Sequence, residues 1–155
     1  MAFIDSVIAK AQSEPKHILL PEPEDERTLR AANEIEAQGI ATVTLIGDQD
    51  VVSAKLKELG IAKDFAIVDP ARAPHFDTFV TELCELRKSK GMTSDQASKL
   101  LKDPIYHGMM MMHKGMGDGL VAGACHSTGD TLRPALQILK TAPGSSLVSS
   151  FFFMC

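Results

Sequence analysis

Aromatic residues and basic clusters are scarce in this 155-residue chain, which contains no tryptophan and only one tyrosine. Sixteen basic residues are outnumbered by twenty acidic ones, and they form no stripe interleaved with aromatic side chains. Such a stripe is the usual footprint of a nucleic-acid surface, so the composition argues against DNA or RNA as a partner. No apolar run approaches the ~18 residues that a membrane-spanning helix requires. The sequence therefore predicts a protein that contacts neither nucleic acid nor membrane.

Cysteine and histidine patterns for disulfides or metals are also missing. The three cysteines, Cys84, Cys125 and Cys155, are odd in number and form no CxxC pair, so neither a disulfide framework nor a zinc site is indicated. The five histidines show no HExxH or other metal-ligand spacing. The first residues, MAFIDSVIAKAQSEPK, lack a basic leader with an apolar core and a cleavage site. We therefore predict no metal, reduced thiols and a cytoplasmic location.

Stretches typical of strands alternate with stretches typical of helices along the chain. Short apolar or β-branched runs predict strands at 17–20, 41–46, 65–68, 120–124 and 147–155. Helical periodicity, capping residues and helix-ending glycines predict helices over 2–13, 25–38, 50–59, 74–90, 93–102, 105–114 and 131–141. The length suffices for one domain with a buried core. This alternation predicts an α/β fold with a three-layer, doubly wound, mostly parallel sheet and helices on both faces.

The last nine residues, LVSSFFFMC, have the composition of a buried strand with no polar tail after it. A buried strand in a parallel sheet needs a covering layer on each face. We therefore expect either a fold that is incomplete at the C-terminus or a partner subunit that covers this end. On the first interpretation, residues 1–145 form an α/β domain that carries part of a substrate site. Residues 146–155 then form the first strand leading into a missing second half.

Glycine-rich nucleotide motifs are absent or misplaced. No GxxxxGK[ST] sequence occurs, which excludes a P-loop. The cluster KGMGDGLVAG (114–123) precedes a predicted strand, whereas a dinucleotide-binding GxGxxG follows a strand and opens a helix. These glycines are more typical of a tight turn and close packing than of nucleotide binding.

The segment CHSTGDTLRP (125–134) lies where a predicted strand ends and a helix begins, the edge at which doubly wound sheets bind ligands. Because proline is tolerated in a first helical turn, Pro134 predicts a helix that begins just before it, with free backbone N–H groups near 130–133. These groups form a candidate anion site with the side chains of Ser127, Thr128, Thr131 and Arg133. Asp130 would oppose an anion unless it caps the helix or braces Arg133, so a structural role for the segment stays open.

Three other segments carry candidates for function. Arg87 precedes Lys88 and Lys90 at the end of a predicted helix, where cations offset the negative end of the helix dipole, so a solvated helix end competes with ligand binding. The four methionines of 109–112 are more typical of a core or an interface than of a ligand pocket. The acidic segment 22–26 would not hold phosphate and is interpreted as a solvated helix start.

Five segments of the chain carry a family resemblance: HSTGDTLRPALQILKTAPG, LPEPEDERTLRAA, KGMTSDQASKLLKDPIYHG, KGMGDGLVAGACHST and LVSSFFFMC. They resemble the phosphate acetyltransferases, or phosphotransacetylases, and together span essentially the whole chain in order. The sequence departs from the family pattern at Pro23, where glycine is common, at Gly129, where alanine is common, and at 116–117. None of these departures removes a candidate ligand.

The resemblance implies reversible transfer of an acetyl group between coenzyme A and inorganic phosphate, with acetyl phosphate as the other partner. It implies no metal and no organic prosthetic group, since coenzyme A is a substrate. By resemblance, Arg87 and Arg133 match arginines that hold anionic substrate groups. Ser127 and Thr131 lie in the matching phosphate-side loop.

Members of this family continue for about as many residues again, and the resemblance puts the catalytic Ser-Arg pair and the carboxylate base in that other part. The catalytic residues are therefore unknown within these 155 residues, and we expect the chain alone to have little or no transferase activity. Two alternatives stay open: a phosphate butyryltransferase, and a non-catalytic acetyl-CoA-binding regulatory domain. A homodimer is a further expectation, from the apolar run 109–112 and the uncovered last strand.

Overall fold

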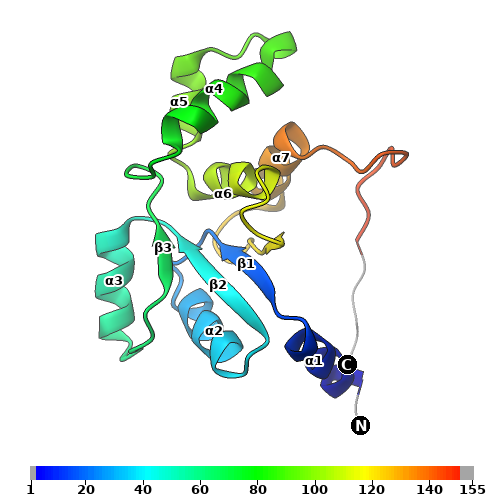
Figure 1. The fold of residues 1–155 in the computed structure, drawn as a ribbon. Coiled ribbons are helices and arrows are strands. Elements are labelled where there is room, and N and C mark those ends of the chain that lie inside the picture. The colour runs from blue at the N-terminus through cyan, green and yellow to red at the C-terminus, as the bar shows by residue number, and fades with distance from the viewer. Residues whose placement is uncertain (1–2, 151–155) are drawn as a thin grey trace.

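Parallel strands and covering helices make up the computed structural model, which describes residues 3–150. The strands are β1 (Lys16–Leu20), β2 (Ala41–Ile46), β3 (Ala66–Val68) and β4 (Gly119–Leu120). The α-helices are α1 (Phe3–Ser13), α2 (Glu26–Ala37), α3 (Gln49–Glu58), α4 (Phe76–Leu86), α5 (Ser94–Leu100), α6 (Pro104–His113) and α7 (Thr128–Ile138). A 3₁₀ turn, η1 (Lys88–Lys90), follows α4. Figure 1 shows α4 and α5 together beyond α6 at one end of the molecule, and α1 at the other.

The four strands are hydrogen-bonded in the order β3-β2-β1-β4, and each neighbouring pair is parallel. The pairing of β1 with β2 runs from Lys16 opposite Ala41 to Leu20 opposite Leu45, and β4 pairs with the other edge of β1. The chain therefore builds outward from β1 to β3 and then returns to the far side of β1. In doubly wound folds such a reversal leaves a crevice at the carboxyl ends of the two strands, here β1 and β4.

Alternate residues of the strands point to opposite faces of the sheet and build two separate cores. On one face Leu20 and Leu45 pack with α2 and α3. On the other face Leu19 and Ile46 pack with α4, α5, α6 and α7. The sheet thus has helices on both faces, which confirms the predicted three-layer α/β fold.

Side-chain caps explain where several helices begin. Thr93 and Gln96 form the reciprocal capping box that their spacing predicts. The carboxylate of Asp103 accepts the backbone N–H groups of Ile105 and Tyr106 at 2.8 and 3.1 Å, and Pro104 occupies the first turn of α6. These caps set the residues at which α5 and α6 begin.

The methionine run lies inside the molecule. Met109, Met110 and Met111 are buried in α6, which packs against the sheet on one side and against α4 and α7 on the other. The interpretation of this run as core is confirmed, because flexible thioether chains fill the irregular space between these layers. These three side chains consequently offer no surface to a partner.

Close packing leaves no room for a side chain at Gly117 and Gly108. A Cβ atom on Gly117 would lie 2.8 Å from Cγ of Leu19 in β1. A Cβ atom on Gly108, in α6, would lie 2.6 Å from Cδ1 of Leu120. The predicted packing role of the glycine cluster is therefore confirmed at Gly117.

Three predicted boundaries are wrong. The strand expected over 120–124 is only Gly119–Leu120, because the following backbone turns away to donate its N–H groups elsewhere. The helix expected over 74–90 ends at Leu86 and gives way to η1. Residues 147–150 form no strand, and the rest of the predicted last strand, 151–155, lies outside the described residues.

The predicted start of the last helix, at 131, is also wrong. Helix α7 begins at Thr128, so Pro134 stands inside it rather than in its first turn. The ring costs one internal N–H···O bond, which the side-chain cap of Ser127 and burial of Pro134 help to offset. The backbone N–H groups at the start of this helix are therefore those near 128–130, not 130–133.

Within the described range, none of the helices has the length and apolar character needed to cross a membrane. The longest, α2, has 12 residues, well short of the ~20 that a bilayer requires.

Replacing Gly108 by alanine should destabilise the fold. The new methyl group would also lie 2.9 Å from Cδ1 of Ile46, and relieving such overlaps in a packed core costs about 1–3 kcal/mol. Gly129→Ala is the matched control, because its Cβ would meet only Oγ of Ser127 at 3.7 Å. Alanine should leave the second site unchanged or stabilise α7 by up to about 1 kcal/mol. Urea denaturation measures both, and equal unfolding free energies would contradict the close packing of α6 on the sheet.

Candidate functional site

Glu22 lies directly after β1, and its carboxylate is surrounded by backbone donors. Its side chain is 2% exposed. The successive N–H groups of Gly123, Ala124, Cys125 and His126 donate to its two oxygens at 2.6, 2.8, 2.9 and 3.0 Å. Gly123 has a φ of +108°, which the loop needs to curve around the carboxylate. The chain's own carboxylate therefore takes up the backbone donors at the carboxyl ends of β1 and β4.

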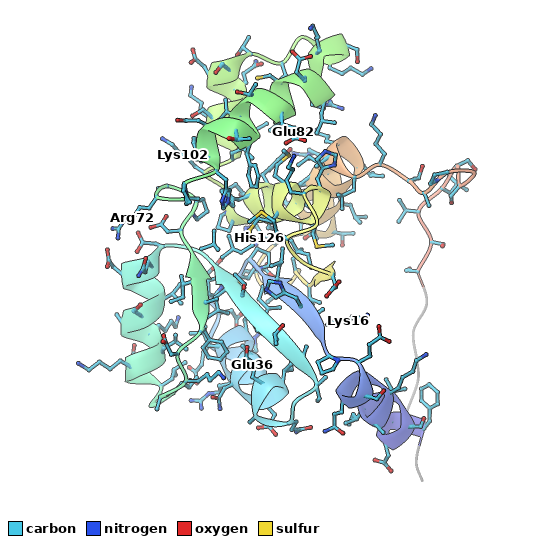
Figure 2. All side chains as sticks on the ribbon, in the orientation of Figure 1. Lys16, Glu36, Arg72, Glu82, Lys102 and His126 are labelled. Carbon is cyan, nitrogen blue, oxygen red and sulfur yellow. The ribbon has the colours of Figure 1, made fainter. Side chains whose placement is uncertain are left out.

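His126 completes the shell around Glu22. Its Nδ1 lies 2.7 Å from Oε1 of Glu22, and Figure 2 shows His126 near the end of β1 that points away from α1. Burial alone would raise the pKa of Glu22, but the N–H of Cys125, the ring of His126 and the N–H groups of Ala124 and Gly123 lower it to about 2. The hydrogen bond to Glu22 raises the pKa of His126 in turn.

The interpretation of segment 22–26 as a solvated helix start is wrong for Glu22, although Glu24 and Glu26 are exposed as expected. The reason is that four backbone donors outweigh the cost of burying one carboxylate. A signal for this burial was present in the sequence, since Glu22 stands between two prolines immediately after an apolar strand.

The predicted hydroxyl residues lie at the start of α7. Ser127 caps the helix by accepting the N–H of Asp130, and its own hydroxyl donates to the Asp130 carboxylate at 2.6 Å. The hydroxyl of Thr131 donates to the carbonyl of Ser127 at 3.2 Å. Thr128 is the exposed first residue of the helix. Ser127 is thus the cap, and Asp130 supports it by accepting its hydroxyl. The hydrogen bond from Ser127 and the charge of Arg133 both lower the pKa of Asp130.

Arg87 and Arg133 line the same cavity, although they lie 46 positions apart in the sequence. Arg87 ends α4, and Arg133 lies on α7. The cavity has a volume of about 490 Å³, and its walls come from η1, α5, α6 and α7 as well. Its lining residues are Arg87, Lys90, Met92, Gln96, Lys99, Leu100, Tyr106, Arg133 and Gln137. Four of them are cationic and none is a carboxylate.

These two arginines differ from the other three in the chain. Arg27, Arg30 and Arg72 each form an ion pair with a carboxylate. Within 3–150, by contrast, no carboxylate lies within ion-pair distance of Arg87 or Arg133, and the buried Nε of Arg87 has no hydrogen-bond partner. A buried guanidinium N–H without an acceptor is costly, so Arg87 lacks a stabilising partner among the described residues.

Tyr106 lies close enough to Arg87 and Arg133 for both charges to affect the pKa of its phenol. Burial raises the pKa of its phenol, whereas the charges of Arg133 and Arg87 act in the opposite direction. Its hydroxyl also donates to Oε1 of Gln137 on α7 at 3.2 Å. The tyrosine thereby ties α6 to α7 beside the cavity, a contact that no motif in the sequence indicated.

A second cavity, of about 420 Å³, lies between α2 and the edge of β1. Its walls are mostly apolar, with Glu22 and Arg27 among the polar residues. Arg27 is already neutralised by Asp25 at 2.6 Å, so this cavity lacks a free cation. The candidate anion site is therefore the cavity that Arg87 and Arg133 share, here called the arginine cavity.

The structure brings together only part of the predicted site. Arg87 and Arg133 share the arginine cavity, whereas Ser127, Thr128 and Thr131 are not among its lining residues. Lys90, Lys99 and Tyr106 line it and were not predicted. Among residues 3–150, no group of three or more histidine, cysteine or acidic side chains has the geometry of a metal site.

A family model for phosphate acetyl/butaryl transferases matches residues 2–155. The chain belongs to this family. Among curated relatives, it is 48% identical over 154 residues to the phosphate acetyltransferase of Thermoanaerobacterium thermosaccharolyticum. The matched region covers 99% of this chain and 47% of that protein. The resemblance in the sequence motifs is thereby confirmed.

Two solved phosphotransacetylases share the fold. The one from Streptococcus pyogenes superimposes with a TM-score of 0.88 at 38% identity and covers 95% of this chain and 46% of its own. The one from Staphylococcus aureus superimposes with a TM-score of 0.83 at 39% identity, covering 93% and 44%. The chain thus spans about half the length of these relatives.

The buried carboxylate of Glu22 should make the stability of this phosphotransacetylase-family chain depend on acid. Its pKa falls from 4.5 to about 2 on folding, so the folded state binds fewer protons. The stabilisation is therefore present above pH 4.5 and is lost as the pH falls toward 2. Replacement of Glu22 by glutamine should remove this dependence, which amounts to about 3 kcal/mol.

The measurement is the unfolding free energy of the wild type and of E22Q from pH 5 down to 3, below the range in which His126, whose pKa Glu22 raises, takes up its proton. Their difference should shrink with falling pH, whereas a constant difference would contradict the account. His107, whose pKa burial lowers to about 4, contributes to both proteins and cancels in the comparison.

Proposed function

We propose that the arginine cavity binds phosphate groups of the substrates of a phosphate acetyltransferase: coenzyme A, acetyl phosphate and inorganic phosphate. The supporting observation is that Arg87 and Arg133, from separate helices, line one cavity without a carboxylate partner in the described part of the chain. Guanidinium groups bind phosphate through charge-assisted N–H···O bonds. Lys90 and Lys99 add positive potential, which suits a ligand that carries several phosphates.

The proposed reaction moves an acetyl group between the sulfur of coenzyme A and an oxygen of phosphate. In the direction of acetyl-CoA formation, the thiolate attacks the acetyl carbon, the bond from that carbon to the phosphate oxygen breaks, and phosphate leaves with the electron pair. Cations near the leaving phosphate stabilise its developing charge. The proposal uses no metal and no prosthetic group, since coenzyme A is itself a substrate. The base and the Ser-Arg pair belong, by family resemblance, outside these 155 residues.

An acetyl group is favoured over butyryl because the matched curated relatives carry the name phosphate acetyltransferase. A cytoplasmic location is supported by the free thiols of Cys84 and Cys125, which suit a reducing compartment. Homodimer formation stays a prediction. Its support now rests on apolar side chains that α7 exposes, such as Leu132 and Leu136, rather than on the buried methionines.

Binding of coenzyme A tests the assignment of the cavity. Isothermal titration calorimetry with the 155-residue chain should give saturable binding. Arg87→Gln and Arg133→Gln should each weaken it about tenfold or more, because each removes a charge-assisted contact. Arg72→Gln is the matched control, since Arg72 pairs with Asp50 on α3 and lies outside the cavity. Wild-type affinity in both cavity variants would contradict the assignment.

Turnover by the chain alone should be low or absent. The arginine cavity can hold an anion, but the resemblance implies that the base needed to make a thiolate lies elsewhere. Formation of acetyl phosphate from acetyl-CoA and phosphate by the purified 155-residue chain is the measurement. Robust turnover would refute the placement of the base outside this chain. Binding without turnover in every longer form of the protein would favour the regulatory acetyl-CoA-binding alternative.

A further inference from the structure

The loop 123–126 is shaped around a carboxylate. Four consecutive backbone N–H groups converge on Glu22, a geometry that forms anion-binding nests in other proteins. The nest stands at the crevice where doubly wound folds hold their ligands. Because Glu22 occupies it, the loop is not open to a substrate anion. Its four donors serve instead to fix the path of the chain between β4 and α7.

That path determines where α7 begins. His126, the last residue bonded to Glu22, directly precedes Ser127, which caps α7. Arg133 follows within the same helix, less than two turns from the cap, so the direction of its side chain follows the start of the helix. Glu22 is thus joined to Arg133 by a short segment of ordered backbone.

Contacts farther along α7 leave its first turns to be held by the loop. Pro134 is buried, Ile138 packs in the core along the later turns of the helix, and Gln137 accepts from Tyr106. By contrast, residues 127–130 are exposed, and the hydrogen bonds of Ser127, Asp130 and Thr131 stay within the helix start itself. Together with Arg27, which donates to the carbonyl of Ala124 at 3.1 Å, Glu22 therefore anchors the start of α7 to the end of β1.

We infer that Glu22 is a positioning residue for substrate binding: by holding loop 123–126, it sets the start of α7 and so directs Arg133 into the arginine cavity opposite Arg87. This inference rests on the proposed function of that cavity. Glu22 itself touches no substrate. Its effect on binding should therefore depend entirely on Arg133.

A double-mutant cycle tests this dependence, with coenzyme A as the probe in calorimetry. Glu22→Gln keeps the shape of the side chain but replaces one acceptor oxygen by an NH₂ group that faces the backbone donors. We expect it to weaken binding roughly tenfold, comparable to losing one charge-assisted contact. In an Arg133→Gln background the same change should have no further effect, because the group it positions is gone.

Glu36→Gln is the matched control for loss of a half-buried carboxylate. Glu36 accepts the N–H of Val43 at 2.8 Å and pairs with Lys63, and Figure 2 shows it on α2, well apart from His126. It should lower stability without changing the affinity for coenzyme A. A loss of binding in E36Q as large as in E22Q would assign the effect to general destabilisation and overturn the inference.

Amide chemical shifts provide a measurement that a loss of stability alone would not change. In ¹⁵N-correlated spectra, E22Q should shift the amide signals of 123–126 and the Nε–Hε signal of Arg133, while signals of β2 and β3 stay in place. If E22Q does not fold, His126→Phe serves as the second variant, since it removes one bond to Glu22 and leaves the four backbone donors. It should shift the same signals and weaken binding by a smaller factor.

The outcomes separate the inference from the function on which it rests. Folded E22Q that binds coenzyme A as tightly as the wild type overturns the positioning role and leaves the cavity assignment intact. Equal losses on adding E22Q to the wild type and to R133Q also overturn it, because Glu22 would then act independently of Arg133. Absence of binding by the wild type would instead contradict the proposed function itself.

Discussion

The carboxylate of Glu22, held by four backbone N–H groups and by His126, is the contact on which the site depends. Burying a charged carboxylate is costly unless its oxygens are fully hydrogen-bonded, and here five donors satisfy them. The contact joins the end of β1 to a loop about 100 residues later in the chain. It also shortens β4, since the N–H groups that would extend that strand turn toward Glu22. The strand β4 is therefore short, and the N–H groups after it fix the connection into α7 instead of extending the sheet.

The second constraint is the unequal neutralisation of the arginines. Three of them form ion pairs with carboxylates, whereas Arg87 and Arg133 line one cavity with lysines and a tyrosine. Like charges gathered in one cavity repel each other unless an anion joins them. The cavity lies among α5, α6 and α7, on the face of the sheet that carries Leu19 and Ile46. The fold thus leaves both guanidinium groups without an ion-pair partner among residues 3–150.

The sequence predicted the α/β layers well because alternation of short apolar runs with capped helices is a local signal, as the box of Thr93 and Gln96 illustrates. It failed where local preference yields to distant contacts. Glu22 looks solvated in an acidic run, since its partners are backbone groups that leave no side-chain pattern. Pro134 suggested a helix start at 131, whereas the cap of Ser127 places it three residues earlier, at Thr128. The meeting of Arg87 with Arg133 has no periodicity behind it, and only the family resemblance pointed to it.

The central claim is that Arg87 and Arg133 form one anion site. The most direct test follows the Nε–Hε signals of all five arginines while coenzyme A is added to the chain. The account predicts that the signals of Arg87 and Arg133 shift together with a single dissociation constant, while those of Arg27, Arg30 and Arg72 stay still because carboxylates already hold them. Separate dissociation constants for Arg87 and Arg133, or movement of the paired arginines alone, would contradict it.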